Sequence, residues 1–533
     1  MTRLLPAHPV LLALYPVVFL LAHNIEEFRP GVALAPLCVV GAAALLLFAS
    51  LSALTGGREK GALLASLAIV LFFGHGFVRA WASAADLDRR PAELSLVLVA
   101  LAVFAASFVL VWRSRRHFAL LNRVLDVAAV VLVLQPLALI AVHEWSFRTG
   151  KPPRSAAEPT LDGLRAVAPA DAPDVYVLVL DGYGRADVLA DVFGADDREL
   201  RGYLESVGFY VADDARANYA QTSLALASAL NLTYVQDLLQ DEPAVLNRKR
   251  LRSLRSLSDL IRDNVAFDRL RRRGYSLTAF SSASSRAEMR DPDVHHTGGV
   301  LDEFETGVLA LTPVPLVARW LSPTRLQGFD PYAHHRERIR YTLEKLPHLT
   351  GRSAPRLVFA HILSPHPPFV FGPGGEPTVP AHPFSTREPD NALDYRRGYR
   401  AQIQYLNVEL RETVAGILAN SERTPAIVLM GDHGPASQWV ELGFDRADIA
   451  EHPGAIRERM SIFLAVLLPS EVGESTALYP GITPINVMRI LLDRTLLEEN
   501  GLIEDKSYFS TYEAPFDFTR VDDMLTTSGR PPQ

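Results

Sequence analysis

The chain has 533 residues, which is too long for one ordinary domain, and 49% of them are hydrophobic. Its formal net charge of −7 gives no sign of the basic surface that nucleic-acid binding requires. Its single cysteine, Cys38, excludes a disulfide framework and thiolate metal clusters. The apolar excess lies in the first 143 residues, so the sequence predicts a membrane part followed by a soluble part.

Five apolar runs occur in the first part, and most of them reach the ~20 residues that cross a bilayer as a helix. They cover residues 9–23, 32–55, 61–81, 93–112 and 124–143. The first run is short enough for the core of a signal peptide, but HNIEEFRP follows it, without a small-residue cleavage site. We therefore predict a transmembrane bundle of five helices over residues 1–143.

The charged loops between these runs predict how the chain crosses the membrane. The loop between the fourth and fifth runs carries four arginines and no acidic residue, and basic loops stay on the cytoplasmic side. Five crossings then place everything after about residue 144 outside, which predicts a multi-pass protein of the cell's inner (cytoplasmic) membrane with an extracytoplasmic domain. The bundle either serves only as an anchor or holds a lipid substrate. We expect four polar residues near its ends to be interfacial rather than ligands: His23, Glu26, Glu27 and His75.

Residues 144–173 contain five prolines, a density that predicts an extended linker. From 174 to 533, short β-branched runs alternate with helical patterns, which predicts an α/β domain with a mostly parallel sheet between helices. The predicted strands are 174–181, 275–282, 356–364, 426–434 and 461–469. The predicted helices are 197–207, 223–231, 257–273, 334–346 and 394–419.

Acidic and imidazole groups stand at the ends of three predicted strands. Asp181 closes the first, His361 and His366 lie around the end of the third, and the pair Asp432-His433 lies at the end of the fourth. Each group alone could belong to an ordinary turn. In a parallel sheet, however, ligands bind beyond the carboxyl ends of the strands, and Asp and His are ligands expected for zinc or manganese. Together the groups predict one metal site at one edge of the sheet.

The stretch NYAQTSLALAS (218–228) carries two hydroxyl groups at the start of a predicted helix, on Thr222 and Ser223. Such hydroxyls are ordinary helix caps, since the side-chain oxygen accepts a backbone N–H. A helix N-terminus also attracts anions, so a hydroxyl there could attack a phosphorus or sulfur centre. The stretch itself leaves both interpretations open.

The segments YVLVLDGYGR, NYAQTSLALAS, HILSPHPPF and IVLMGDHGP resemble the motifs of the alkaline phosphatase and sulfatase-like superfamily. The five-helix layout is similar to its membrane branch, which contains lipoteichoic acid synthases and lipid A phosphoethanolamine transferases. The resemblance implies that Thr222 is the nucleophile and also a metal ligand, with Ser223 only capping the helix. It further implies that Asp181, Asp432 and His433 complete a site for one divalent ion, zinc or manganese.

The resemblance also implies that His366 contacts the transferred group, together with His361. The chain departs from the transferases in lacking the cysteines that staple their domain. It departs from most sulfatases as well, because TSLALAS has neither the Pro nor the Arg of the formylglycine signal. We expect the remaining histidine pairs, at 295–296 and 334–335, to be surface or helix residues.

The resulting functional expectation is a membrane-anchored, metal-dependent phosphotransferase that acts on phosphoesters of membrane lipids or envelope glycans. A phospho-threonine intermediate would pass its group to an acceptor alcohol or to water. Two other classes stay open. One is a membrane-tethered hydrolase of phosphate or sulfate esters that uses the same residues, and the other is a non-catalytic envelope scaffold.

Overall fold

The computed structural model describes most of the chain. The described ranges are 5–25, 28–84, 89–148, 172–239, 253–282, 285–289, 291–298, 301–321, 329–349, 355–378, 391–443, 451–469 and 478–525. Most of the predicted linker, residues 149–171, lies outside these ranges, as do Glu26 and Glu27. The chain divides into two compact units. One consists of Met1–Lys151, Val300–His334 and Pro380–Phe384, and the other of Pro152–Gly299, His335–Val379 and Ser385–Gln533.

The first unit contains the five helices that the apolar runs predict. They are α1 (His8–His23), α2 (Leu34–Thr55), α3 (Arg58–Ala84), α4 (Arg89–Arg113) and α5 (Ala119–Arg148). Four helical spans, those of α2 to α5, are long and apolar enough to cross a membrane, whereas α1 is a shorter apolar helix of 16 residues. The prediction of an N-terminal bundle of apolar helices is confirmed.

A buried polar cluster joins α1 to α3 and α5 inside this bundle. The ring nitrogens of His8 lie 2.6 Å from Ser66 Oγ and 2.8 Å from Asn122 Oδ1. Asp126 caps the start of α1, because its Oδ1 accepts the backbone N–H groups of Ala7 and His8 at 2.8 Å. Every polar atom of the His8 ring thus has a partner, as burial in an apolar bundle requires.

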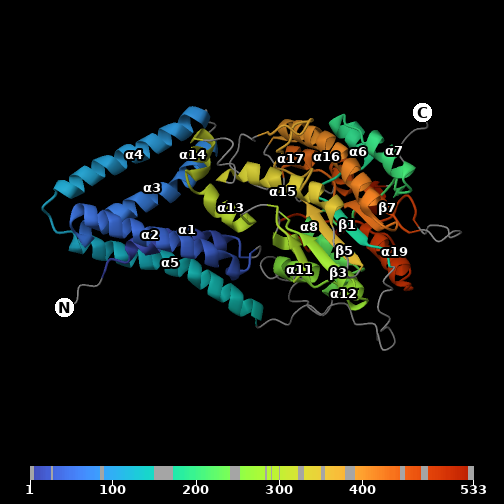
Figure 1. Ribbon diagram of the computed structural model, residues 1–533, viewed down its shortest axis with the longest axis horizontal. Coiled ribbons are helices and arrows are strands. Elements are labelled where there is room, and N and C mark those ends of the chain that lie inside the picture. Colours follow the sequence, from blue (N-terminus) through green and yellow to red (C-terminus); the bar gives the residue numbers. More distant parts are fainter. Residues whose placement is uncertain are drawn as a thin grey trace. The chain divides into compact units, whose positions relative to one another are not determined.

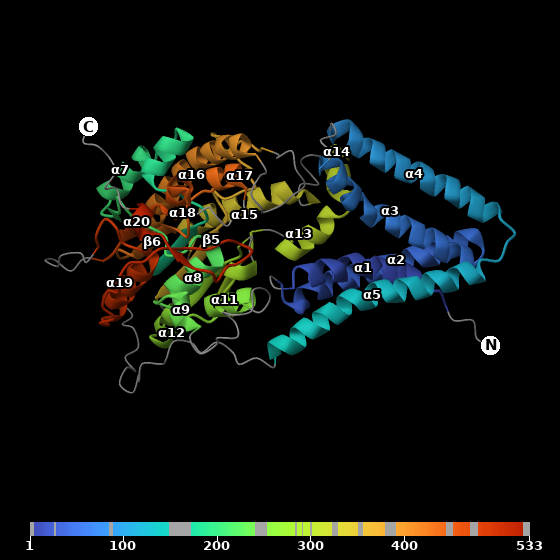
Figure 2. The ribbon, with the colours of Figure 1, turned by 180° about the vertical axis from the view of Figure 1, so that it is seen from behind.

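A helix from far along the sequence also belongs to this unit. Helix α13 (Glu303–Ala310) begins with a capping box between Asp302 and Glu305 and lies against α1 (Figure 2). Phe304, which is 1% exposed, meets Phe28 edge to face with ring centroids 5.3 Å apart. The Gly76 N–H of α3 donates to Leu311 O at 2.9 Å, and a Cβ at Gly76 would lie 2.5 Å from Leu311 Cα. Glycine at this position therefore permits the close approach of the two backbones. Helix α14 (Val314–Leu321) follows α13.

The second unit is built around a seven-stranded sheet with the order β2-β7-β6-β1-β5-β3-β4. The strands are β1 (Val175–Leu180), β2 (Tyr210–Val211), β3 (Ser276–Phe280), β4 (Val294–His296), β5 (Arg356–Ile362), β6 (Ala426–Gly431) and β7 (Leu464–Leu467). Strand β1 is fully buried between β5 and β6 and pairs in parallel with both. Strand β7 runs antiparallel to both of its neighbours. The prediction of a mostly parallel sheet is confirmed.

Helices cover this sheet on two sides, with α8 and α12 on one side and α16 on the other (Figure 1). The principal ones are α7 (Arg198–Ser206), α8 (Thr222–Leu230), α11 (Ser253–Arg262), α12 (Val265–Arg272), α15 (Pro331–Lys345), α16 (Ala392–Asn420), α17 (Ser437–Leu442), α18 (Pro453–Met460) and α19 (Pro484–Leu496). The predicted helix 257–273 is in fact two helices. Asn264 separates them, because its side chain accepts the Phe267 N–H at 2.8 Å and starts α12.

Candidate metal centre

Three adjacent central strands bring the predicted ligands to one edge of the sheet. Asp181 directly follows β1, His361 is the penultimate residue of β5, and Asp432 directly follows β6. In the register of the sheet, Leu180 pairs with both Ile362 and Gly431. The three side chains therefore come together because parallel strands end at the same edge.

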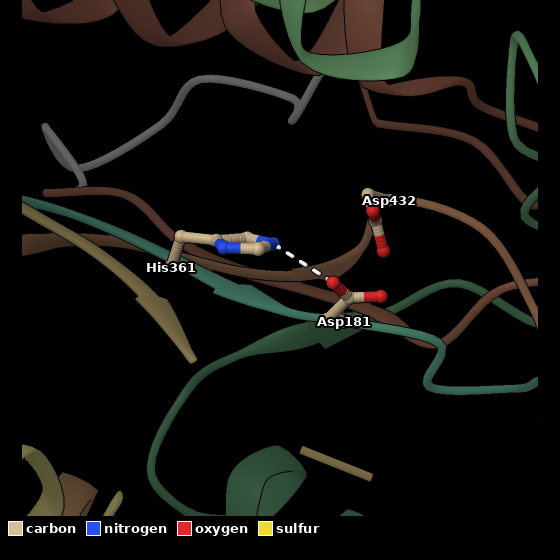
Figure 3. Close-up of side chains that lie close together, drawn as sticks. All are labelled: Asp181, His361 and Asp432. Carbon is tan, nitrogen blue, oxygen red and sulfur yellow. Dashed lines mark ion pairs between the residues drawn. The ribbon is translucent and has the colours of Figure 1, made fainter. Parts of the chain in front are cut away.

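The ligand atoms of Asp181, His361 and Asp432 all lie within 4.8 Å of one another (Figure 3). His361 Nε2 is 3.2 Å from Asp181 Oδ2. His433 joins the group, with Nε2 at 3.6 Å from Asp181 Oδ1 and 3.5 Å from Asp432 Oδ2. These four side chains come from three strand ends and are all buried.

The polar atoms of this group suit a cation. Within the described part of the chain, Asp181 Oδ1 and Asp432 Oδ2 are buried without a hydrogen-bond partner. Buried carboxylates are costly unless they are paired or coordinate a metal. Two carboxylates and two imidazoles form a donor set that suits zinc or manganese, and a divalent ion would compensate the orphaned oxygens.

Neighbouring groups fix the orientation of these donors. His433 Nδ1 donates to the Gly434 carbonyl at 3.0 Å, which leaves the lone pair of Nε2 directed at the carboxylates. Ser282 Oγ lies 2.7 Å from His361 Nδ1, and the Gly182 N–H donates to Asp432 Oδ1 at 3.1 Å. Contacts of this kind hold metal ligands in one tautomer and one orientation.

The pKa directions agree with a metal-ligand role. Burial, together with the nearby charge of Arg459, lowers the pKa of His433 to about 4. Burial by itself would raise the pKa of Asp181, but the charge of His366 and the hydrogen bond from His361 outweigh it and hold that pKa below its usual range. At neutral pH the imidazole of His433 is neutral and the carboxylate of Asp181 is charged, as metal binding needs.

Thr222 lies beside this centre as the first residue of α8. Its Oγ1 is 3.1 Å from His433 Nε2. Gln221 is the N-cap of α8, and its side chain makes no capping hydrogen bond. Ser223, expected to cap, is 4% exposed, and within the described residues its Oγ has no hydrogen-bond partner.

His366 is held next to the centre by the loop that follows β5. Its backbone N–H donates to Asp181 O at 2.9 Å, and its ring lies 6.3 Å from that of His433. Its Nδ1 donates to Pro367 O at 2.7 Å. Helix α16 supports the same loop, since Gln402 donates to His366 O at 3.1 Å.

The other candidate positions lie outside this cluster. The polar side chains that precede Thr222 bind the C-terminal segment, with Asn218 donating to Lys506 O and Gln221 to Ser510 O, both at 3.1 Å. The pair 295–296 lies in β4, and the pair 334–335 lies in α15, where both histidines are buried rather than at the surface. His75 is buried within α3.

Arg459, in α18, is a further residue of the centre that sequence patterns did not indicate. It is 1% exposed, and its Nη2 lies 3.1 Å from His433 Nε2. Nothing in the local sequence RERMS distinguishes this arginine from Arg457, whose side chain is partly exposed and paired with Asp187 and Asp191. The two arginines are distinguished by their tertiary contacts.

Comparison with known proteins gives distant structural likenesses only. No protein-family model and no curated protein matches the chain. The C-terminal periplasmic domain of EcEptC from Escherichia coli is similar at 10% identity and a TM-score of 0.39, covering 64% of this chain and 91% of that one. The integral membrane lipooligosaccharide phosphoethanolamine transferase A (EptA) from Neisseria meningitidis is similar at 12% identity and a TM-score of 0.35, covering 86% and 88%.

The phosphonate monoester hydrolase of Agrobacterium radiobacter is also similar, at 14% identity and a TM-score of 0.36, covering 63% of this chain and 80% of that one. With TM-scores below 0.4, these three likenesses carry no part of the functional argument.

Proposed function

We propose that this protein is a membrane-anchored, metal-dependent phosphotransferase that acts on phosphoesters of membrane lipids or envelope glycans, with Thr222 as its nucleophile. One observation carries the proposal. The Thr222 hydroxyl lies 3.1 Å from His433 Nε2, and this nitrogen is 3.5 to 3.6 Å from the carboxylates of Asp432 and Asp181. A hydroxyl at a helix start therefore adjoins a buried group of orphaned metal donors.

Each side chain has a defined task in this proposal. Asp181, Asp432 and His433, with His361 beside them, would hold one zinc or manganese ion. When bound, such an ion lowers the pKa of a neighbouring hydroxyl and offsets phosphoryl charge. The first N–H groups of α8 have no acceptor inside the helix, so they favour an anion next to Thr222.

The reaction is a double displacement at phosphorus. Thr222 Oγ1 forms a bond to phosphorus while the bond from phosphorus to the leaving oxygen breaks, and that oxygen keeps the electron pair. His366 Nδ1 is committed to the Pro367 carbonyl, so Nε2 is the nitrogen that takes the proton released by Thr222 Oγ1 and passes it to the leaving oxygen. An acceptor alcohol then takes the phosphoryl group from Thr222 by the reverse set of steps.

The apolar helices α2 to α5 support a lipid or envelope substrate, since they would keep the catalytic unit at a membrane surface. The arginine-rich loop between α4 and α5 supports an extracytoplasmic position for that unit. A scaffold without catalysis would not need four metal-donor side chains beside a helix-start hydroxyl. Hydrolysis differs from transfer only in the final acceptor.

The test offers headgroup-labelled phospholipids to membranes that carry the wild-type protein or Thr222→Ala. We expect label to move to an envelope glycan or to another lipid with the wild-type protein only. Label released mainly into water would establish the hydrolase instead. Absence of any label movement from zinc- or manganese-supplemented wild-type membranes would refute both enzymatic functions.

A further inference from the structure

Arg459 ties together the two segments that carry the nucleophile and a metal ligand. Its Nε donates to Ala220 O at 2.8 Å, two residues before Thr222. Its Nη1 donates to Gly434 O at 3.1 Å, one residue after His433. A side chain that is 1% exposed thus satisfies one carbonyl from each segment, and its guanidinium plane is fixed relative to both.

The remaining nitrogen of this guanidinium is directed at the centre. Nη2 lies 3.1 Å from His433 Nε2 and 3.0 Å from Tyr512 Oη. Thr222 Oγ1 is also 3.1 Å from His433 Nε2. One nitrogen atom therefore has both the proposed nucleophile and an arginine N–H as neighbours.

His433 Nε2 cannot serve Arg459 and a cation at the same time. Its Nδ1 donates to Gly434 O, so Nε2 has a single lone pair to share. When that lone pair binds a metal, Arg459 Nη2 can no longer donate to it. A charged N–H directed at the centre then favours an oxygen acceptor in the space beside Thr222.

The aromatic surroundings hold the guanidinium where it is. Trp439 lies under it, with Arg459 Cζ 5.5 Å from the ring centroid, and Trp439 stacks on Tyr512 at an angle of 9°. A planar cation on an aromatic face, with two N–H groups committed to carbonyls, has little freedom to move away. The acceptor must therefore come to Arg459.

We infer that Arg459 binds an oxygen of the phosphoryl group that Thr222 attacks, exchanging His433 for that oxygen once the metal is in place. The inference rests on the proposed function, and it names the ligand of this position as a tetrahedral oxyanion. A guanidinium is the side chain best suited to such an oxygen, because the hydrogen bond is charge-assisted. Arg459 is thereby a substrate-binding residue, and its contacts to Ala220 and Gly434 position it.

The experiment uses the full-length protein in detergent, with inorganic phosphate as the probe and calorimetric titration as the readout. Zinc or manganese is titrated first, and phosphate is then titrated into the metal-loaded protein. We expect Arg459→Gln to bind phosphate about 10- to 100-fold more weakly, the range for a lost hydrogen bond to a charged group. Arg459→Lys should fall between the two, since it keeps the charge but not the fork of donors.

The matched control is Arg457→Gln, on the same helix but paired with Asp187 and Asp191, and its phosphate affinity should equal that of the wild type. Metal affinity distinguishes a substrate-binding role of Arg459 from a purely structural role. Because Arg459 competes for His433 Nε2, Arg459→Gln should bind the metal at least as tightly as the wild type. A purely structural arginine would lose metal and phosphate affinity together, and that result would overturn the inference.

Unchanged phosphate affinity in Arg459→Gln, or no phosphate binding by the metal-loaded wild type, would overturn it as well. If Arg459→Gln does not fold, Arg459→Lys carries the same comparison against Arg457→Gln. Failure of the proposed function would be seen separately, as normal turnover in Thr222→Ala. Phosphate binding that depends on Arg459 would survive that failure.

Discussion

The variant Thr222→Ala tests whether the Thr222 hydroxyl has a structural role or takes part in the reaction. Among the described residues, its Oγ1 lies 3.1 Å from His433 Nε2, and the side chain of the N-cap residue Gln221 makes no capping hydrogen bond to α8. Losing the hydrogen bond to His433 costs about 1 kcal/mol, and the better helix propensity of alanine offsets a few tenths of it. The free energy of unfolding should therefore fall by less than about 1 kcal/mol.

Loss of a nucleophile has a much larger effect on the rate. It lowers turnover by on the order of 10⁴- to 10⁶-fold, which is about 5 to 8 kcal/mol of transition-state stabilisation. The assay measures turnover of a phosphodiester or lipid substrate and the melting temperature on the same metal-loaded preparation. Thr222→Ser should keep part of the activity, because its hydroxyl stays beside His433, and Ser223→Ala should be mild. Near-normal turnover in folded Thr222→Ala would refute the covalent mechanism and direct attention to Ser223 or to a water molecule.

Three further predictions follow from the same structure. Asp432→Asn should weaken metal binding, and its activity should recover in part at high zinc or manganese concentration. Metal analysis and metal titration of the activity would show this. Activity that stays lost at saturating metal would contradict the role of Asp432 as a ligand. The pKa of His433 is about 4 in the folded state against 6.5 for the ordinary residue, so the unfolded metal-free chain binds more protons between these values. Its free energy of unfolding should therefore fall by up to about 3 kcal/mol as the pH drops from 6.5 to 4, and a flat melting profile over that window would count against it. Gly76→Ala should destabilise the full-length protein by roughly 1 to 3 kcal/mol, because its Cβ would lie 2.5 Å from Leu311 Cα, whereas Gly74→Ala, with nothing within 4 Å of its Cβ, should melt like the wild type.

Much of the fold could be predicted because helices and buried strands each give a recognisable spacing of apolar residues in the local sequence. The predicted helices 197–207 and 223–231 differ from α7 and α8 by one residue at each end. The sequence does not reveal which partner an apolar face will have. The pattern of 303–310 is that of any partly apolar helix, and its partners Phe28 and Gly76 lie more than 200 residues earlier in the chain. Tertiary pairing of this kind has no local signal.

The metal donors could be predicted for a different reason, and the same reason explains why Arg459 could not. Asp181, His361 and Asp432 are found at strand ends, and in parallel strands those ends share one edge, so chain order alone brings them together. If β7 were parallel to β6, the residues that precede β7 would lie at the opposite edge of the sheet from the metal donors. Because β7 is antiparallel to β6, its first residues lie at the carboxyl edge, and the Gly431 N–H donates to Phe463 O at 2.8 Å there. Arg459, the penultimate residue of α18, lies just before this strand and therefore reaches His433. The direction of a single strand thus decides whether the site contains an arginine.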